Sequence, residues 1–391
     1  MRIGLFTDSN IFYIDGVGRI IQALIRHVEA RPEHSLLVFH RSRDAKPRQK
    51  HGANIAIRGV GARYVHVPGY DAYPFFYLSN PRARLLAETR DFRPDLLLTV
   101  TPYVPRGIGS AALAVGRKLD VPVIGSFDVP LAWYSDYYAR QLLRFDWAVS
   151  LWQRFVSYMM SGYQSCKAIV VPSRAMEAYA HELYGDVECV LFPRAVDCEK
   201  FSPTFRDESF RARHGLADKA TILYLGRLAL EKNLGALGEI YDSLKSRNPQ
   251  IALLVVGEGP ERKQLADRGT PDMVFTGSLH GDDLLRAYAS ADIFAFPSVV
   301  DAGPMVILEA QASGLPVIAP NTGGAQDCIV SGETGFVVDG MAEFEKRLEE
   351  LIRDEPLRAQ MSSNARKLAE GRAWDPTLER LLADLSAVAA R

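Results

Sequence analysis

Two carboxylates stand eight positions apart in the segment DAGPMVILE, where Asp301 precedes a Gly-Pro step and Glu309 follows it. An ionised carboxylate only accepts hydrogen bonds, and a sugar hydroxyl can donate one to it. The pair could therefore hold the hydroxyl groups of a sugar. The alternative is the start of an ordinary helix with solvated acidic residues.

The Gly-Pro step itself, Gly303-Pro304, predicts where that helix begins. Proline is favoured at the first helical position, because an N–H group there would have no acceptor within the helix and its loss costs nothing. The free N–H groups of Met305 and Val306 then point out of the helix start, and that end of a helix favours anions. The predicted helix covers residues 304–313 and carries the second carboxylate.

Two cations follow a predicted strand in the segment GRLALEKN. The guanidinium fork of Arg227 and the point charge of Lys232 would suit a diphosphate. The alternative is a loop whose charges are solvated. Another loop, IDGVGRII, follows the first predicted strand, and its Gly16 would let a ligand approach the backbone closely. That loop lacks the spacing of a dinucleotide-binding fingerprint.

Short apolar runs bounded by turn residues alternate with longer helical patterns along the whole chain, which is typical of βαβ units and parallel sheets. The first half contains predicted strands at 2–6, 35–39, 95–100, 121–126 and 168–173. The second half contains predicted strands at 221–226, 252–257, 273–277, 293–298, 315–320 and 335–338. The motifs above follow strand ends, where ligands of open α/β sheets bind.

The length of 391 residues corresponds to about two domains. We expect an α/β fold with a Rossmann-like domain over 1–195, a second one over 196–370, and a final helix in 371–391 that returns to the first domain. The irregular, charged segment 190–209 is the expected linker. Two doubly wound parallel sheets joined in this way should face each other across a cleft.

The composition is that of a globular protein, with 48% apolar and 24% charged residues and no run of about 20 apolar residues. The four cysteines lack metal-ligand spacing, so we expect no metal site and a cytoplasmic protein. Residues 1–195 carry 24 Lys and Arg against 17 Asp and Glu. Such a basic half either attracts phosphates or anionic lipid, or is simply solvated. No nucleic-acid module is recognisable, so no nucleic-acid partner is expected.

The segments YLGRLALEKNL, VVGEGPERKQL, LEAQASGLPVIAPNTGG and SGETGFVV follow one another in an order and spacing that resemble the retaining glycosyltransferases of family 4. The resemblance covers nearly the whole chain. It implies the GT-B fold, with the acceptor-side domain first and the donor domain second. It also implies transfer of a hexose from a UDP- or GDP-sugar with retention at the anomeric carbon, without a required metal or cofactor.

The same resemblance assigns Arg227 and Lys232 to the diphosphate of the nucleotide-sugar donor. Gly16 falls on the loop that approaches the donor from the other domain. The free N–H groups of Met305 and Val306 are assigned to the same diphosphate because they lie at a helix start.

The remaining predicted site residues act on the ribose and the sugar. Glu309 falls where the family holds the ribose hydroxyls, and Asp301 and Gly303 fall at the donor sugar. Asp301 is one methylene shorter than the family's glutamate, and Gly303-Pro304 replaces the family's Phe-Gly. Asp128 stands where the family has a histidine. Its carboxylate can accept a hydrogen bond from a sugar hydroxyl or stabilise positive charge. Asp128 and Asp301 are therefore the predicted catalytic residues.

The sequence indicates the acceptor substrate less clearly than the sugar donor. Residues 133–164 mix aromatic residues with Arg140, Arg144 and Arg154 in a largely helical pattern, which fits a membrane-surface helix or core helices of the first domain. The core interpretation is favoured. Residues 41–51 form a predicted basic loop. The acceptor stays open between a lipid-linked, a glycan and a small-molecule substrate; the first would place the protein in contact with anionic lipid at the inner face of the membrane.

Two other functions remain open at this stage. A non-catalytic protein that binds a nucleotide-sugar or a glycan could keep the same fold, and Asp128 and the Gly-Pro step are the residues that favour it. A GT-B enzyme with a different reaction, such as release of a sugar phosphate or epimerisation, is a third. Turnover of a nucleotide-sugar distinguishes the first from an enzyme.

Overall fold

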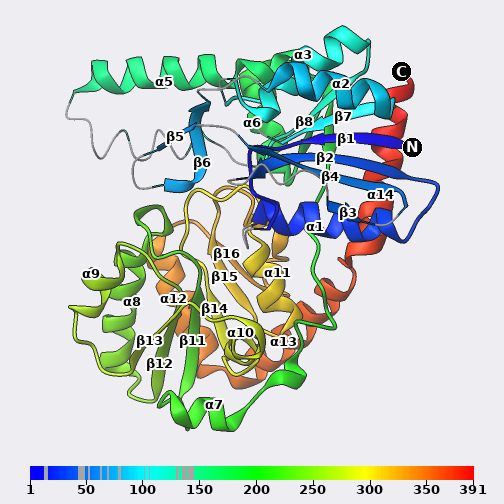
Figure 1. Cartoon of the computed structure of the whole chain (residues 1–391). Helices are drawn as coiled ribbons and strands as arrows, with labels where there is room; N and C mark the ends of the chain where they lie inside the picture. The colour runs from blue at the N-terminus through cyan, green and yellow to red at the C-terminus, as the bar shows by residue number, and fades with distance from the viewer. Residues whose placement is uncertain are drawn as a thin grey trace. The chain divides into compact units, whose positions relative to one another are not determined.

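The structure is a computed structural model of the whole chain. It describes residues 1–12, 16–42, 49–51, 53–61, 64–67, 70–77, 81–100, 102–104, 106–128, 131, 133, 139 and 145–391. The chain divides into two compact units, one formed by Met1–Pro193 with Asp375–Arg391 and the other by Arg194–Trp374. Each unit is built on a parallel sheet with helices between the strands, which confirms the predicted α/β class (Figure 1).

The first unit contains an eight-stranded sheet in the order β10-β9-β8-β7-β1-β2-β4-β3. Its strands are β1 (Arg2–Phe6), β2 (Ser35–Ser42), β3 (Gln49–His51), β4 (Ile55–Gly61), β7 (Leu96–Thr99), β8 (Val123–Ser126), β9 (Ala168–Val171) and β10 (Cys189–Leu191). All these pairings are parallel except that of β3 with β4. A separate antiparallel pair consists of β5 (Tyr64–Val67) and β6 (Tyr70–Tyr77).

Helices cover both faces of this sheet. They are α1 (Gly16–Glu29), α2 (Arg82–Phe92), α3 (Ile108–Leu119), α5 (Asp146–Met160), α6 (Arg174–Tyr184) and α14 (Trp374–Ala390). Figure 1 shows α2 and α3 on one face and α1 on the other. The last helix packs beside α1, where Nδ1 of His27 lies 2.7 Å from Oδ1 of Asp375 and Arg31 donates to Glu379 at 2.6 Å.

The second unit contains a six-stranded, wholly parallel sheet in the order β13-β12-β11-β14-β15-β16. Its strands are β11 (Ala220–Leu225), β12 (Ile251–Val256), β13 (Met273–Gly277), β14 (Ile293–Ala295), β15 (Val317–Pro320) and β16 (Gly335–Val338). Its helices are α7 (Glu208–Arg213), α8 (Leu234–Arg247), α9 (Arg262–Ala266), α10 (Gly281–Ala289), α11 (Met305–Ala312), α12 (Met341–Arg353) and α13 (Glu355–Glu370). The strand order reverses between β11 and β14, and such a reversal is where open α/β sheets bind ligands.

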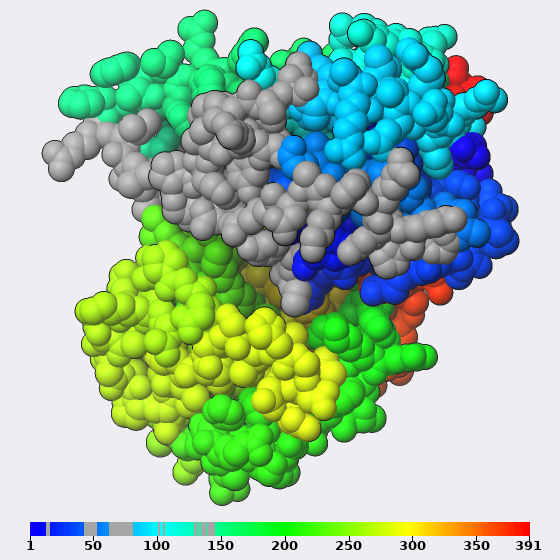
Figure 2. Space-filling model, viewed as in Figure 1, coloured from blue at the N-terminus to red at the C-terminus, as the bar shows by residue number. Residues whose placement is uncertain are grey.

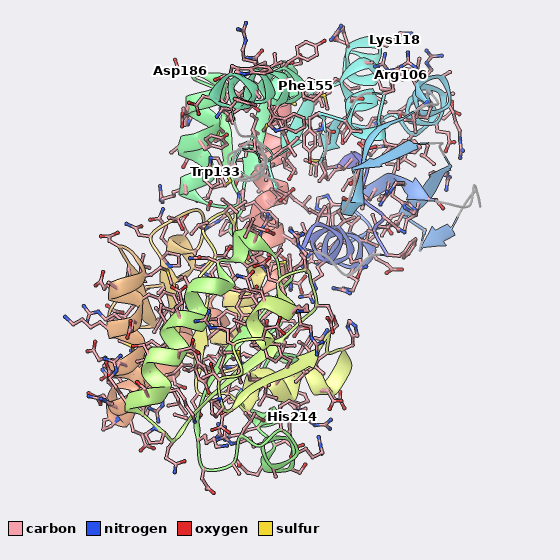
Figure 3. The ribbon with its side chains drawn as sticks, turned by 90° about the vertical axis from the view of Figure 1, so that its left-hand side faces the viewer. Arg106, Lys118, Trp133, Phe155, Asp186 and His214 are labelled. Carbon is pink, nitrogen blue, oxygen red and sulfur yellow. The ribbon has the colours of Figure 1, made fainter. Side chains whose placement is uncertain are left out.

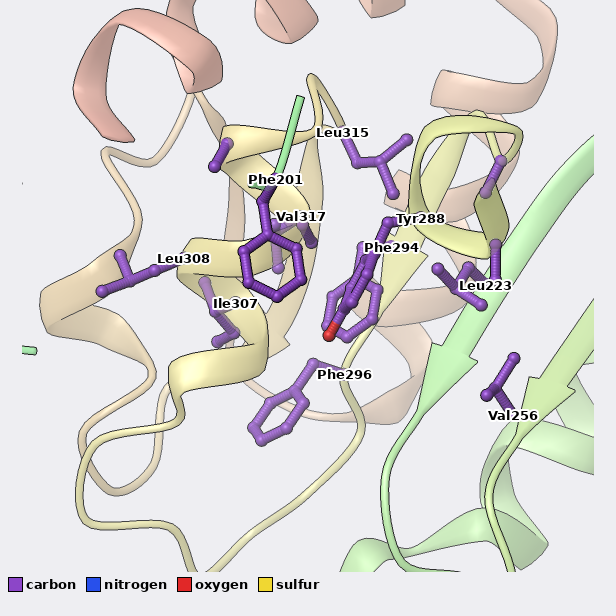
Figure 4. Close-up of a cluster of buried hydrophobic side chains, with 14 of the residues drawn as sticks. Phe201, Leu223, Val256, Tyr288, Phe294, Phe296, Ile307, Leu308, Leu315 and Val317 are labelled. Carbon is purple, nitrogen blue, oxygen red and sulfur yellow. The ribbon is translucent and has the colours of Figure 1, made fainter. Parts of the chain in front are cut away.

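Alternating side chains of β11 face two separate cores, as the two-residue period of a strand requires. Leu223 packs with residues of α10 and α11, whereas Ile222 packs with residues of α8 and α12. In the first of these cores the ring of Tyr288 lies 5.6 Å from Phe201 and 6.1 Å from Phe294, measured between ring centroids (Figure 4). This packing holds α10 and α11 against the sheet.

Some predicted segments have more regular structure than expected. The predicted linker 190–209 begins inside β10 and reaches the start of α7. The predicted basic loop 41–51 begins at the end of β2 and ends in β3, while its residues 43–48 lie outside the described residues. β3 and β4 were not predicted, because their residues become strands only by pairing with one another and with β2.

The loops that follow β11 and β12 run directly against each other. Gly226 donates to the carbonyl of Val256 at 3.0 Å, and Leu228 donates to that of Glu258 at 2.9 Å. A side chain at Gly257 would begin 1.9 Å from the carbonyl oxygen of Gly226, and Gly257 has φ +134°. The absence of a side chain there sets the path of the chain after β11.

Gly257→Ala should lower the free energy of unfolding by about 2–4 kcal/mol, because the new methyl group adds a backbone clash to an unfavourable φ. Gly235→Ala is the matched control: Gly235 lies in α8, a methyl group added there would have no atom within 4 Å, and that change should stabilise by up to about 1 kcal/mol. Chemical denaturation measures both. Equal effects of the two substitutions would contradict the packing of the loops.

Candidate active site

The carboxyl ends of β11 and β14 bring together Lys232 and Asp301, two residues that are 69 positions apart. Nζ of Lys232 donates to both carboxylate oxygens of Asp301, at 2.9 and 2.7 Å. The Lys232 side chain is 13% exposed and that of Asp301 is 18% exposed. The hydroxyl of Ser298 donates to the same carboxylate. Asp301 is therefore held by a cation and a hydroxyl in a partly buried setting.

Arg227, the second predicted cation, is held by a partner that lies one turn further along. Its guanidinium donates to Glu231, whose side chain is fully buried, while Arg227 itself is 41% exposed. A buried carboxylate is costly without a charged partner, so Glu231 favours one position of the guanidinium. The exposed part of Arg227 remains accessible to a ligand at the end of β11.

The hydroxyl of Tyr224 lies within electrostatic range of these charges. It donates to the main-chain carbonyl of Arg227 at 2.9 Å. Burial raises the pKa of Tyr224 well above its ordinary value; the charges of Asp301 and Glu231 raise it further, and Arg227 lowers it. Tyr224 therefore stays protonated and remains a hydrogen-bond donor. The three charged residues lie close enough to act on one hydroxyl.

Helix α11 begins immediately after the Gly-Pro step, with Pro304 as the residue that precedes it. Within the described residues, the main-chain N–H groups of Met305 and Val306 have no hydrogen-bond acceptor. Gly303, Met305 and Val306 are each partly exposed. The helix start thus lies four residues beyond Asp301, the carboxylate that Lys232 holds, and its role in binding a diphosphate stays a prediction.

Glu309 lies one turn further along α11 and is 2% exposed. Its Oε2 accepts a hydrogen bond of 2.8 Å from the hydroxyl of Tyr288, which lies on α10 and is itself buried. The structure thus gives this carboxylate a buried partner from a neighbouring helix. Its assignment to a ribose stays a prediction.

Gly16 and Asp128 belong to the first unit. Gly16 is the exposed first residue of α1, and no atom lies within 4 Å of a side chain built there. Asp128 follows β8, is partly exposed and accepts a hydrogen bond from the hydroxyl of Ser126. Both Ser126 and Asp128 line a cavity of about 30 Å³ whose other walls are apolar residues of α1, α14 and the strand ends. The carboxylate is thus oriented by a neighbouring hydroxyl.

Three residues that support the predicted site were not predicted from the sequence. Glu231 stands beside Lys232 in GRLALEKN, and this position next to a predicted site residue could have identified it. Ser298 precedes Asp301 by three residues, which is a similar signal. Tyr288 is 21 residues from Glu309, and only the packing of α10 against α11 brings the two together. Of the described residues, no group of three His, Cys, Asp or Glu side chains is placed to hold a metal ion.

Two family models match successive parts of the chain. The model described as Glycosyltransferase Family 4 matches residues 14–200, and the model described as Glycosyl transferases group 1 matches residues 206–368. The chain belongs to the family 4 glycosyltransferases. The two matches follow one another along the chain and correspond to the two sheets.

Relatives of this glycosyltransferase use several sugars. It is 29% identical to a sulfoquinovosyl transferase of Arabidopsis thaliana, over 95% of this chain and 71% of the relative. It is 28% identical to a GDP-mannose-dependent alpha-mannosyltransferase of Corynebacterium glutamicum, over 100% of this chain and 91% of the relative. It is 25% identical to an alpha-monoglucosyldiacylglycerol synthase of Streptococcus pneumoniae, over 82% of this chain and 71% of the relative.

Solved structures confirm the fold of the glycosyltransferase. The Anabaena protein HepE, solved in complex with UDP-glucose, superposes with a TM-score of 0.71 at 17% identity, over 99% of this chain and 100% of that one. Together with the two parallel sheets, this likeness confirms the predicted GT-B fold. No helix in the described ranges of the chain is both long and apolar enough to span a bilayer.

Lys232→Ala should weaken binding of a bare nucleoside diphosphate to the glycosyltransferase by about 1.5–3 kcal/mol, the scale of a charge-assisted hydrogen bond. Lys219→Ala is the matched control, because Lys219 pairs with Asp272 at 2.7 Å at the opposite end of β11. Titration calorimetry with UDP and GDP measures both variants. Unchanged affinity in Lys232→Ala would remove this residue from the diphosphate site.

Tyr288→Phe should weaken binding of the bare nucleotide about 3- to 10-fold, because Glu309 loses the hydrogen bond that orients it. Tyr241→Phe removes another buried hydroxyl of the same unit, one that donates to Pro271 at 2.9 Å, and should leave nucleotide affinity unchanged. Both variants need a denaturation curve alongside the titration. If they change affinity equally, Tyr288 has no specific relation to the site.

Proposed function

We propose that this glycosyltransferase moves a hexose from a UDP- or GDP-sugar to a lipid-linked acceptor, with retention at the anomeric carbon and without a metal ion. The observation that supports this most strongly is the pair of Lys232 and Asp301 at the strand reversal, close to the start of α11. It combines a cation for a phosphate with a carboxylate for a sugar hydroxyl.

Donor binding would proceed by exchange of partners. In the free protein Lys232 is paired with Asp301 and Arg227 with Glu231. An incoming diphosphate carries more negative charge than one carboxylate, and it can bond to both cations and to the N–H groups at the start of α11. Asp301, released from Lys232, is then available to accept a hydrogen bond from a hydroxyl of the sugar. Recognition of the diphosphate and of the sugar would thereby be coupled.

The same groups would act during transfer. As the bond between the anomeric carbon and the diphosphate breaks, negative charge grows on the phosphate oxygen, and Lys232, Arg227 and the helix start stabilise it. Positive charge grows on the sugar ring, and the carboxylates of Asp301 and Asp128 are the proposed groups that stabilise it. Retention means that the acceptor oxygen bonds to the anomeric carbon on the face from which the diphosphate departed, while the proton of the acceptor hydroxyl passes to the departing diphosphate.

Two fixed cations and a helix start supply the charge that a divalent ion would otherwise bring to the diphosphate. The proposal therefore needs no metal, and a chelator should leave the transfer rate unchanged. Under the same proposal no other cofactor takes part, because the nucleotide-sugar is a substrate.

A lipid-linked acceptor is supported by the name of the relative that makes a glucosyldiacylglycerol and by the basic balance of residues 1–195. Anionic lipid would attract such a surface. We accordingly place the reaction at the cytoplasmic, inner face of a membrane, with peripheral contact to the lipid. A glycan or small-molecule acceptor is the outcome if lipid acceptors remain unmodified.

The proposal predicts different effects for the two carboxylates. Glu309→Gln should weaken both the bare nucleotide and the full donor, since both contain the ribose. Asp301→Asn should leave bare-nucleotide affinity undiminished, because Lys232 becomes free, yet lower kcat about 10-fold or more with the full donor. Asp272→Asn is the control: its carboxylate also accepts from two lysines, Lys219 and Lys245, at the other end of the sheet.

The assay combines nucleotide titration with transfer from UDP- and GDP-hexoses to a diacylglycerol-type acceptor. A donor at about 100 times its Kd should also stabilise the fold by about 2.7 kcal/mol, which identifies the nucleotide before activity is measured. Binding without turnover for any donor and acceptor would favour the non-catalytic alternative. Wild-type behaviour of both Asp301→Asn and Glu309→Gln would show that DAGPMVILE is only scaffold.

A further inference from the structure

Helix α5 of the first unit presents an apolar face to solvent. Its inner face is buried through Val149, Val156 and Met160. Its outer face, with the residue that precedes the helix, forms what we call the α5 stripe. The exposed fractions of the stripe residues are 62% for Phe145, 69% for Trp147, 63% for Leu151, 38% for Trp152, 39% for Phe155 and 76% for Tyr158.

The stripe is continuous along one side of the helix. Trp147, Leu151, Phe155 and Tyr158 are spaced by four, four and three residues, so they lie in one row. Neighbouring rings approach each other, with centroids 6.4 Å apart for Phe145 and Trp147 and 5.7 Å apart for Trp152 and Phe155. Figure 1 shows α5 extending beyond the strands of its sheet, and Figure 3 labels Phe155 on it.

This concentration distinguishes α5 from the rest of the described surface. Eight large apolar side chains are exposed among the residues that the structure describes, and six of them belong to the α5 stripe. Figure 2 shows the α5 side chains, in green, at the outer edge of the first unit. Scattered apolar residues need no explanation, but a contiguous exposed patch marks an interaction surface. The favoured sequence interpretation, a core helix, describes only the inner face of α5.

The composition of the stripe fits a lipid interface. Tryptophan and tyrosine have an apolar body and a polar tip, and they gather at the headgroup level of membranes. The sequence around the helix is basic, with five Lys and Arg and one Asp between residues 140 and 174. Of these, Arg154 is exposed on α5 itself. Such charges are complementary to anionic headgroups.

The length and burial of the helix fit the plane of a membrane surface. With 15 residues, α5 is about 22 Å long. The helix is also shorter than the roughly 20 residues that span a bilayer, and its other face is buried in the protein. A helix of this kind lies in the plane of a membrane surface.

We propose that the α5 stripe docks the enzyme on an anionic bilayer, with its aromatic side chains at the boundary between headgroups and acyl chains. The inference deepens the proposed function by naming the surface that would bring the enzyme to a lipid acceptor. The benefit of docking, although not docking itself, rests on that proposed function. Docking itself requires only the stripe and basic side chains such as the exposed Arg154.

The test is co-sedimentation of the full chain with vesicles of 70% phosphatidylcholine and 30% phosphatidylglycerol, compared with vesicles of phosphatidylcholine alone. The variant is Trp147→Ser combined with Tyr158→Ser; both side chains are mostly exposed, so folding should be unaffected. Phe12→Ser is the control, since Phe12 is also exposed, at 53%, and lies outside the stripe. The double variant should lose 10-fold or more in partitioning, and the control should bind like the wild type.

Two further measurements separate the alternatives. Quenching of tryptophan fluorescence by lipids brominated on the acyl chain should occur in the wild type and fall in Trp147→Phe, and quenching unchanged by that substitution would overturn the proposed insertion. Sedimentation equilibrium without lipid should give the same mass for wild type and double variant. A wild-type dimer that becomes a monomer in the double variant would assign the stripe to a second copy instead.

The same variants distinguish a failure of docking from a failure of the proposed function. Transfer to a short-chain acceptor in detergent should be equal in wild type and double variant, while transfer to the same headgroup in vesicles should fall in the variant. Wild-type binding to vesicles by the double variant would overturn the docking proposal even if transfer is observed. Vesicle binding that depends on the stripe, without transfer to any lipid, would overturn the lipid acceptor and leave docking intact.

Discussion

The reversal of strand order between β11 and β14 is the constraint on which the second unit of this protein depends. Crossovers between parallel strands keep one hand, so the chain builds outward from β11 in one direction and from β14 in the other. The segments that leave these two adjacent strands therefore diverge to opposite faces. Lys232 and Asp301 meet at this point although the chain places 68 residues between them.

A second consequence follows from the burial of the charges at that point. Each site cation has a carboxylate partner in the free protein, and the partner of Arg227 is fully buried. Leaving such charges unpaired would destabilise the second unit, because a buried ion without a partner is costly. The pairs thus keep the unit stable without a ligand and hold the cations in the place where a diphosphate would need them. Under the proposed function, binding of the diphosphate would require an exchange of partners rather than the assembly of a site.

The sequence was sufficient for most strands of the two large sheets and for the positions of some candidate site residues. Strands such as β11 and β12 are apolar on both faces, and a run of that kind between turn residues predicts a buried parallel strand directly. The proximity of Lys232 and Asp301 could have been predicted from the sequence, because both residues follow the ends of predicted strands. Tyr288 was not, since its contact with Glu309 depends on how two helices pack. For α5 the sequence left a membrane-surface helix and a core helix both open, because an aromatic row has the same period whether it faces a core or solvent.

Amide hydrogen exchange of the intact chain, with and without a saturating nucleoside diphosphate, tests the central claim most directly, because it locates the bound nucleotide without any substitution. The account predicts that UDP or GDP slows exchange in the loop after β11, residues 226–233, and in the first turn of α11, residues 305–308. Protection that leaves both segments unchanged while the nucleotide is bound would place the site elsewhere and contradict the account.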